Sequence, residues 1–113
     1  MKQVTAVFRP IRLEAIEQAF HALPHLPGFT ILPARGHPRG HGPDHRYVAD
    51  DWDFDGHQHL VLLAFCSDEV VEELVQAIST AAYTGVPGDG VVAVSSLTEA
   101  LRIRTGERGD AAL

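Results

Sequence analysis

The sequence predicts an α+β fold of the ferredoxin-like type, a βαββαβ sandwich in which two helices pack on one sheet. Two segments repeat apolar residues at three- and four-residue steps, as amphipathic helices do. Short segments rich in β-branched, aromatic and other apolar residues alternate with them and predict four strands, at 3–8, 28–32, 60–65 and 91–94. The 113 residues are enough for one domain, 1–113.

Each predicted helix has a start, an apolar stripe and a stop. The first follows Pro10, ends at Pro24, and has a stripe made of Leu13, Ile16, Phe20 and Leu23. The second is predicted to begin at Ser67, whose hydroxyl can cap it ahead of two acidic residues. Its stripe consists of Val71, Leu74, Val75, Ile78 and Ala82.

The predicted strands 60–65 and 91–94 are apolar at every position, whereas a half-buried strand alternates apolar and polar residues. Both strands are therefore predicted to be covered on both faces. Because the helices of a two-layer fold cover one face only, we expect further copies of the chain to cover the other face in a symmetric homo-oligomer.

Composition excludes several classes of protein. The net charge of −6 and the pI near 5.5 argue against a nucleic-acid binder. No stretch approaches the roughly 20 apolar residues of a membrane span, and the N-terminus lacks the apolar core of a signal peptide. The single cysteine, Cys66, cannot form an internal disulfide. These features predict a cytoplasmic protein.

Two motifs near the C-terminus predict an anion site. The turn 84–90 holds three glycines, and glycines allow backbone N–H groups to converge on an anion. The basic segment 102–109 places Arg102 and Arg104 two residues apart, which puts both on one side of an extended chain. Two neighbouring guanidiniums in an acidic chain indicate a phosphate ligand.

The motif Thr-Gly-x-x-Gly-Asp-Gly at 84–90 and the motif Arg-Ile-Arg-Thr-Gly-Glu-Arg-Gly at 102–109 resemble the two signatures of the PII-type signal-transduction proteins. The order of elements is similar along nearly the whole chain. The resemblance implies a homotrimeric regulator, not an enzyme, that binds ATP or ADP between subunits, with AMP as a further possibility. It also implies that a long loop controls a partner, here a membrane transporter.

The same resemblance implies a nucleotide site. Gly88, Asp89 and Gly90 would hold the phosphates and ribose from one subunit, and Arg102 and Arg104 would bind phosphate oxygens. Five more residues match family positions around the base and phosphates: Gly28, Phe29, Thr30, Gly36 and Arg39.

Four departures from the family pattern matter for function. Val91 stands where the family usually has a lysine that follows Gly-Asp-Gly. Gly40 aligns with the glutamine, and His59 with the lysine, that serve 2-oxoglutarate binding, while Trp52 aligns roughly with the uridylylated tyrosine. The chain is therefore not expected to be a standard nitrogen sensor.

The segment 36–56 is predicted to be a loop, because its first residues are rich in glycine and proline, and long loops are usually functional. Five histidines lie in or beside it: His37, His41, His45, His57 and His59. With nearby aspartates they could bind a divalent metal such as zinc, nickel or copper. The alternative function is thus a heavy-metal-binding protein of the same fold, associated with an efflux pump. A polar loop without a metal, and a slow ATPase, are two further readings.

Overall fold

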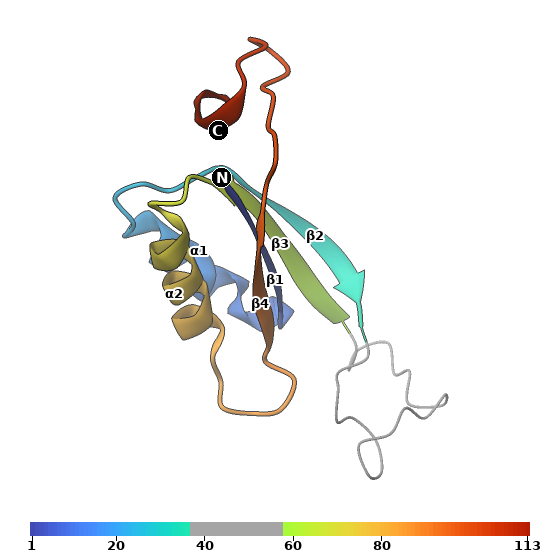
Figure 1. Cartoon of the computed structure of the whole chain (residues 1–113). Helices are drawn as coiled ribbons and strands as arrows, with labels where there is room; N and C mark the ends of the chain where they lie inside the picture. The colour runs from blue at the N-terminus through green and yellow to red at the C-terminus, as the bar shows by residue number, and fades with distance from the viewer. Residues whose placement is uncertain (37–57) are drawn as a thin grey trace.

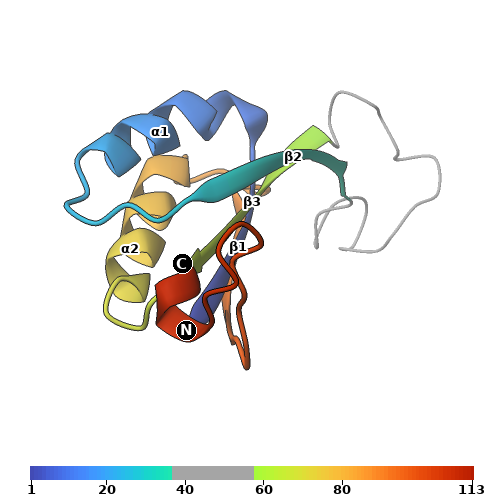
Figure 2. The same ribbon diagram turned by 90° about the horizontal axis from the view of Figure 1, so that it is seen from above.

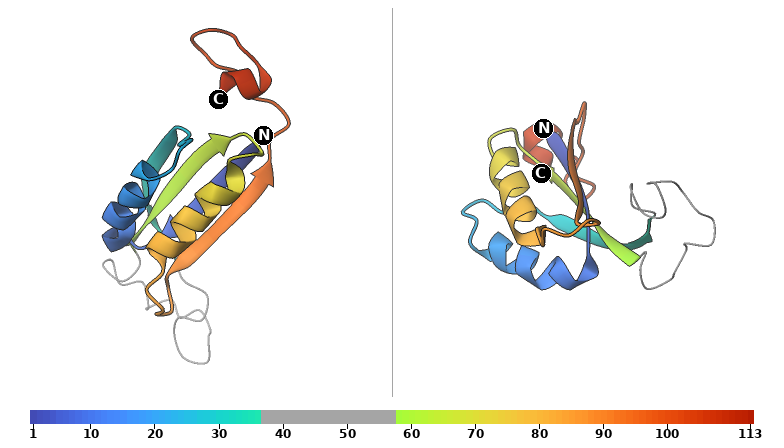
Figure 3. Two further views of the ribbon diagram at one scale, coloured as in Figure 1. Left: turned by 90° about the vertical axis from the view of Figure 1, so that its left-hand side faces the viewer. Right: turned by 90° about the horizontal axis from the view of Figure 1, so that it is seen from below.

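The computed structural model describes residues 1–36 and 58–113. One antiparallel sheet has four strands in the order β2-β3-β1-β4, and both helices pack on the same face of it (Figures 1 and 3). The strands are β1 (Lys2–Phe8), β2 (Phe29–Arg35), β3 (Gln58–Cys66) and β4 (Gly90–Ser96). The helices are α1 (Leu13–His21) and α2 (Val71–Ala82), with 3₁₀ turns at Pro10–Arg12 and Gly109–Ala112. The predicted βαββαβ order is confirmed.

The core lies between the helices and the sheet. Val4, Ala6 and Phe8 alternate along β1 toward the helices, and the register pairs Ala6 with Leu62 of β3, so the same face continues across strands. The helices add buried residues at helical spacing: Ile16, Phe20, Leu74 and Ile78. The predicted apolar stripes therefore form the core.

Within residues 1–36 and 58–113, no helix covers the opposite face of the sheet. Phe65 of β3 and Leu32 of β2 are exposed there, and Val91 of β4 is 63% exposed. The prediction that further copies of the chain cover the second face of β3 and β4 stays a prediction, because the structure is of one chain. The apolar sequence of these strands nevertheless leaves an apolar surface, which a second subunit can bury.

The start of the second helix was predicted wrongly. Its cap residue is Val70, with no side-chain cap, and α2 begins at Val71. The carbonyl oxygen of Ser67 accepts a hydrogen bond from the N–H of Val70, which makes a turn before the helix. Asp68 is instead bound to the Met1 ammonium at 2.8 Å, because β1 brings the N-terminus next to this turn.

The strand β2 is longer than predicted and continues through Pro33 to Arg35. A proline is tolerated there because, in the described part of the chain, β2 is an edge strand that pairs only with β3. Residues 37–57 connect β2 to β3 and lie outside the described residues, as does nearly all of the loop predicted at 36–56. The two chain ends lie at one end of the molecule (Figure 2).

Candidate functional site

The glycine turn, residues 84–90, joins α2 to β4 and is closed by the carboxylate of Asp89. The carboxylate accepts hydrogen bonds from the N–H groups of Thr84 at 2.8 Å and of Gly85 at 3.0 Å, and from the Thr84 hydroxyl. Arg9 donates to it from the end of β1 at 3.3 Å. The pKa of Asp89 is lowered to about 2, chiefly by the bond from the Thr84 hydroxyl and then by the Thr84 N–H.

The turn was expected to gather backbone N–H groups around an anion. Two of them do converge on an anion, but that anion is the carboxylate of Asp89 itself. The carboxylate therefore determines the shape of the turn. A cleft of about 440 Å³ lies beside the turn, between α2 and β4, and Tyr83, Asp89 and Gly90 contribute to its lining.

Gly90 is required where the turn enters β4. Its φ is +106°, and a Cβ at this position would overlap the carbonyl group of Val7 on the neighbouring strand. The backbone of β4 thus approaches β1 more closely than any side chain allows. This close approach is the structural reason for the last glycine of the motif.

The basic segment does not have the predicted extended conformation. Leu101 pairs with Arg108, the N–H of Arg102 donates to the carbonyl oxygen of Glu107 at 2.9 Å, and the chain turns between them. The expected extended conformation is therefore wrong, and alternation along a strand cannot be what brings Arg102 and Arg104 together. Both side chains are exposed, and Ile103 between them is 95% exposed. Arg108 forms an ion pair with Glu99.

The structure separates the predicted nucleotide-binding residues within one chain. The turn with Gly88, Asp89 and Gly90 lies at the start of β4, and the basic segment with Arg102 and Arg104 lies beyond its end (Figure 1). Seven strand residues span roughly 20 Å. Gly28, Phe29 and Thr30 lie at the same end of the molecule as the basic segment. Gly36 lies at the opposite end, as the glycine turn does, but it follows β2, which is the other edge strand of the sheet.

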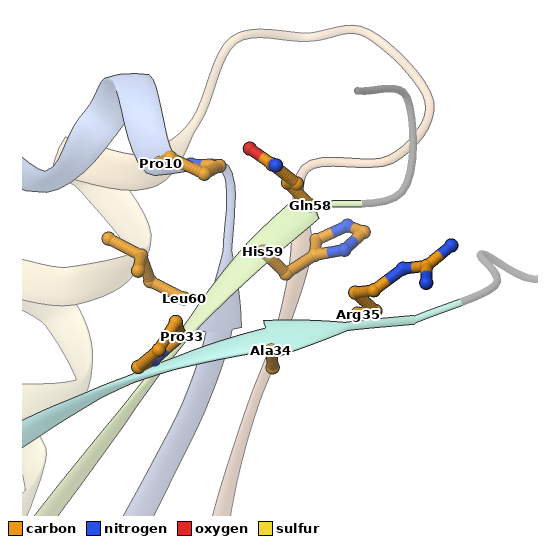
Figure 4. Close-up of a pocket in the computed structure, with 7 residues that line it drawn as sticks. All are labelled: Pro10, Pro33, Ala34, Arg35, Gln58, His59 and Leu60. Carbon is orange, nitrogen blue, oxygen red and sulfur yellow. The ribbon is translucent and has the colours of Figure 1, made fainter. Parts of the chain in front are cut away.

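A second pocket, of about 430 Å³, lies where β2 ends and β3 begins (Figure 4). Its polar lining comes from Arg35, Gln58 and His59, and its apolar lining includes Pro10 and Leu60. His59 is 9% exposed and is the one buried polar side chain among residues 1–36 and 58–113. It pairs with Ala34 in the sheet, so its backbone position is well defined.

The proposed metal ligands lie almost wholly outside the described residues. This applies to His37, His41, His45 and His57, and also to Arg39 of the predicted nucleotide site. His59 alone lies within them. No group of three or more potential metal ligands occurs in the part of the chain that the structure describes.

The sequence did not reveal the role of Arg9. Besides its bond to Asp89, it donates to the carbonyl oxygen of Pro87 in the same turn. The only signal was a basic residue at the end of a predicted strand, which is common on protein surfaces. Its partner lies 80 residues later, and sequence spacing does not show that β1 and β4 are neighbours.

Comparison with known proteins identifies the family. The family model described as "Nitrogen regulatory protein P-II" matches residues 1–107. The chain is 35% identical to a nitrogen regulatory protein P-II of Rhodospirillum rubrum and 33% identical to one of Azospirillum brasilense, over all 113 residues and the full length of each. It is 32% identical, over the same span, to the nitrogen regulatory protein GlnK of Escherichia coli K12.

No helix in the described residues is long and apolar enough to cross a bilayer. The match covers the motif at 84–90, all but the last two residues of the motif at 102–109, and nearly the whole chain. The chain therefore belongs to the P-II nitrogen regulatory protein family, whose members are signal-transduction proteins and not enzymes, and at about one-third identity it is a divergent member.

Proposed function

We propose that this chain is a cytoplasmic P-II-type regulator that binds an adenine nucleotide between the subunits of a homotrimer and controls a membrane transporter through loop 36–56. The separation of the two motifs is the observation that supports this best. The glycine turn and the basic segment lie beyond opposite ends of β4. A phosphate that touches both must therefore be bound by two subunits.

The open face of the sheet supports the oligomer. Leu32 of β2, Phe65 of β3 and Val91 of β4 expose apolar side chains on this one face, and large exposed apolar surface often marks an interface. The exposed basic segment extends away from the sheet, at the end where the chain termini lie (Figure 1). A projecting segment of this kind can reach a neighbouring subunit and bring Arg102 and Arg104 to its glycine turn.

The departures from the family pattern shape the proposal. Val91 adds no charge next to the turn, and Gly40 and His59 replace residues that serve 2-oxoglutarate binding in the family. The ligand that switches this protein is accordingly the nucleotide itself. A ligand shifts the loop only if it binds two loop states with different affinity.

The proposal is tested by calorimetry with ATP, ADP and AMP, together with sedimentation of the unliganded protein. We expect a trimer and one nucleotide for each subunit. No heat with any of the three nucleotides at millimolar concentration would overturn nucleotide binding. A monomer that binds nucleotide would overturn the site between subunits.

A further inference from the structure

Arg9 connects the end of β1 to the glycine turn. Its Nε donates to Oδ1 of Asp89 at 3.3 Å, and its Nη2 donates to the carbonyl oxygen of Pro87. One guanidinium therefore holds the residues on both sides of Gly88. The planar, forked geometry of arginine suits such a double contact, because its donors have fixed relative directions.

Gly88 lies directly against this guanidinium. Its φ is +99°, and a Cβ at this position would lie 2.9 Å from Nη2 of Arg9. A side chain at 88 would displace Arg9 from the turn even if the backbone accepted the strain. The glycine thus serves the contact with Arg9 as well as the turn.

The charge at the turn requires a cation. A phosphate near Gly88 and Gly90 would meet the negative carboxylate of Asp89, in a chain whose net charge is −6. The segment 84–91 itself contains no lysine or arginine, and Val91 is apolar. Arg9 directly follows β1 and supplies a full positive charge at this place.

Arg9 also retains donors for a ligand. A guanidinium has five N–H groups, and the contacts with Asp89 and Pro87 use two of its nitrogens. Its side chain is 34% exposed, and within residues 1–36 and 58–113 it makes no other hydrogen bond. The side chain thus combines N–H groups without a hydrogen bond in the described residues with a partly exposed surface.

We propose that Arg9 is a positioning residue of the nucleotide site. It holds Gly88 and Asp89 in the conformation that receives phosphate, and it provides the positive charge that Val91 does not provide. This inference rests on the proposed function, because it assigns a role within the same phosphate site.

The test compares Arg9→Gln with Arg12→Gln as a matched control. The Nε of Arg12 donates to the carbonyl oxygen of Ala81, before the turn, at 2.9 Å, and the side chain makes no hydrogen bond to residues 84–90. Calorimetry measures the affinities of ATP, AMP and adenosine for each protein. Arg9→Gln should weaken ATP binding about tenfold, as expected for a lost charge-assisted contact, and leave adenosine binding unchanged.

Arg12→Gln should leave ATP affinity within about twofold of the unchanged protein. Arg9→Lys keeps the charge and should lose less ATP affinity than Arg9→Gln, which provides a second route if Arg9→Gln folds poorly. Equal losses for ATP and adenosine, equal losses for the two Gln variants, or no loss with Arg9→Gln would overturn the role of Arg9. If the unchanged protein binds no nucleotide, the proposed function fails and this inference fails with it.

Discussion

The backbone of Gly90 lies against the carbonyl group of Val7, so closely that a Cβ at position 90 would come within 2.7 Å of the Val7 carbonyl carbon. Replacement of Gly90 by alanine must push β4 away from β1 or distort the turn, and the φ of +106° adds strain. We expect Gly90→Ala to lower the free energy of unfolding by on the order of 3 kcal/mol or more. Urea denaturation measures this change.

Gly109→Ala is the control for Gly90→Ala. Gly109 also has a positive φ, of +72°, but a Cβ there would meet nothing within 4 Å. In this variant only the strained backbone conformation should lower the free energy of unfolding, by on the order of 1 kcal/mol. Similar losses in the two variants would show that β4 can move away from β1 without penalty.

The low pKa of Asp89 predicts a pH-dependent contribution to stability. The folded-state pKa of about 2 lies below the ordinary value of 3.8, so the unfolded state takes up a proton first as the pH falls. The stabilisation is complete well above pH 3.8 and is lost as the pH falls toward 2. We expect Asp89→Asn to be less stable than the unchanged protein at neutral pH, with a difference that shrinks over this range.

Thr84→Val tests the cause of this shift, because the Thr84 hydroxyl is the largest contributor to it. NMR titration of the Asp89 carboxyl carbon should show the pKa moving back toward 3.8 in this variant. An unchanged pKa would mean that the backbone N–H groups and Arg9 are sufficient to keep the pKa of Asp89 low without the Thr84 hydroxyl. Asp68 keeps its link to Met1 in all these proteins, so its own lowered pKa cancels in the comparison.

The sequence predicted the elements well because each of them depends on local patterns. The stripe at Ile16 and Phe20 and the alternation at Val4, Ala6 and Phe8 are visible without any tertiary information, and these residues form the core. The residues at which helices and strands begin and end were less predictable. Ser67 is a good capping residue by type, but β1 brings the Met1 ammonium to Asp68 and the helix begins later.

The site was harder to predict than the fold, because its contacts join distant parts of the chain. The motif located the glycine turn, but the hydrogen bond from Arg9 to Asp89 forms because β1 and β4 are adjacent in the sheet. The basic segment shows a second limit. Alternation assumed an extended chain, whereas the hydrogen bond between Arg102 and Glu107 closes a turn there.

The two exposed arginines of the basic segment should contribute to nucleotide affinity and not to stability. Replacing Arg102 or Arg104 with alanine should cost a charge-assisted contact of about 1.5–3 kcal/mol, or roughly ten- to a hundredfold in ATP affinity. Arg108→Ala is the control, since Arg108 pairs with Glu99 and should affect the local turn instead. Unchanged affinity with weaker subunit association would instead make Arg102 and Arg104 ordinary interface residues.

The histidines predicted to bind metal can be tested by thermal denaturation with and without zinc. If His57 and His59 are ligands, zinc at one hundred times its dissociation constant should stabilise the protein by about 2.7 kcal/mol, and His57→Ala with His59→Ala should abolish that increment. His59 is buried, so its loss also lowers the melting temperature without metal. The informative quantity is therefore the stabilisation that each protein gains when zinc is added. His21→Ala at the end of α1 is the control, and an equal increment in all variants would indicate non-specific binding.

Val91 lies directly after the turn and is 63% exposed in the single chain, on the sheet face that the proposed trimer covers, so a longer side chain there does not enter the core of the subunit. Val91→Lys adds a cation beside Gly88 and Gly90, and a cation there should act mainly on the outer phosphates. We expect ATP to bind more tightly by about tenfold and AMP by much less, because each charge-assisted contact contributes about that factor. Val91→Gln is the control, since it adds length without charge and should leave both affinities nearly unchanged. Equal gains for ATP and AMP would show that the outer phosphates do not lie against this turn, and the site would then have to be placed elsewhere on the subunit.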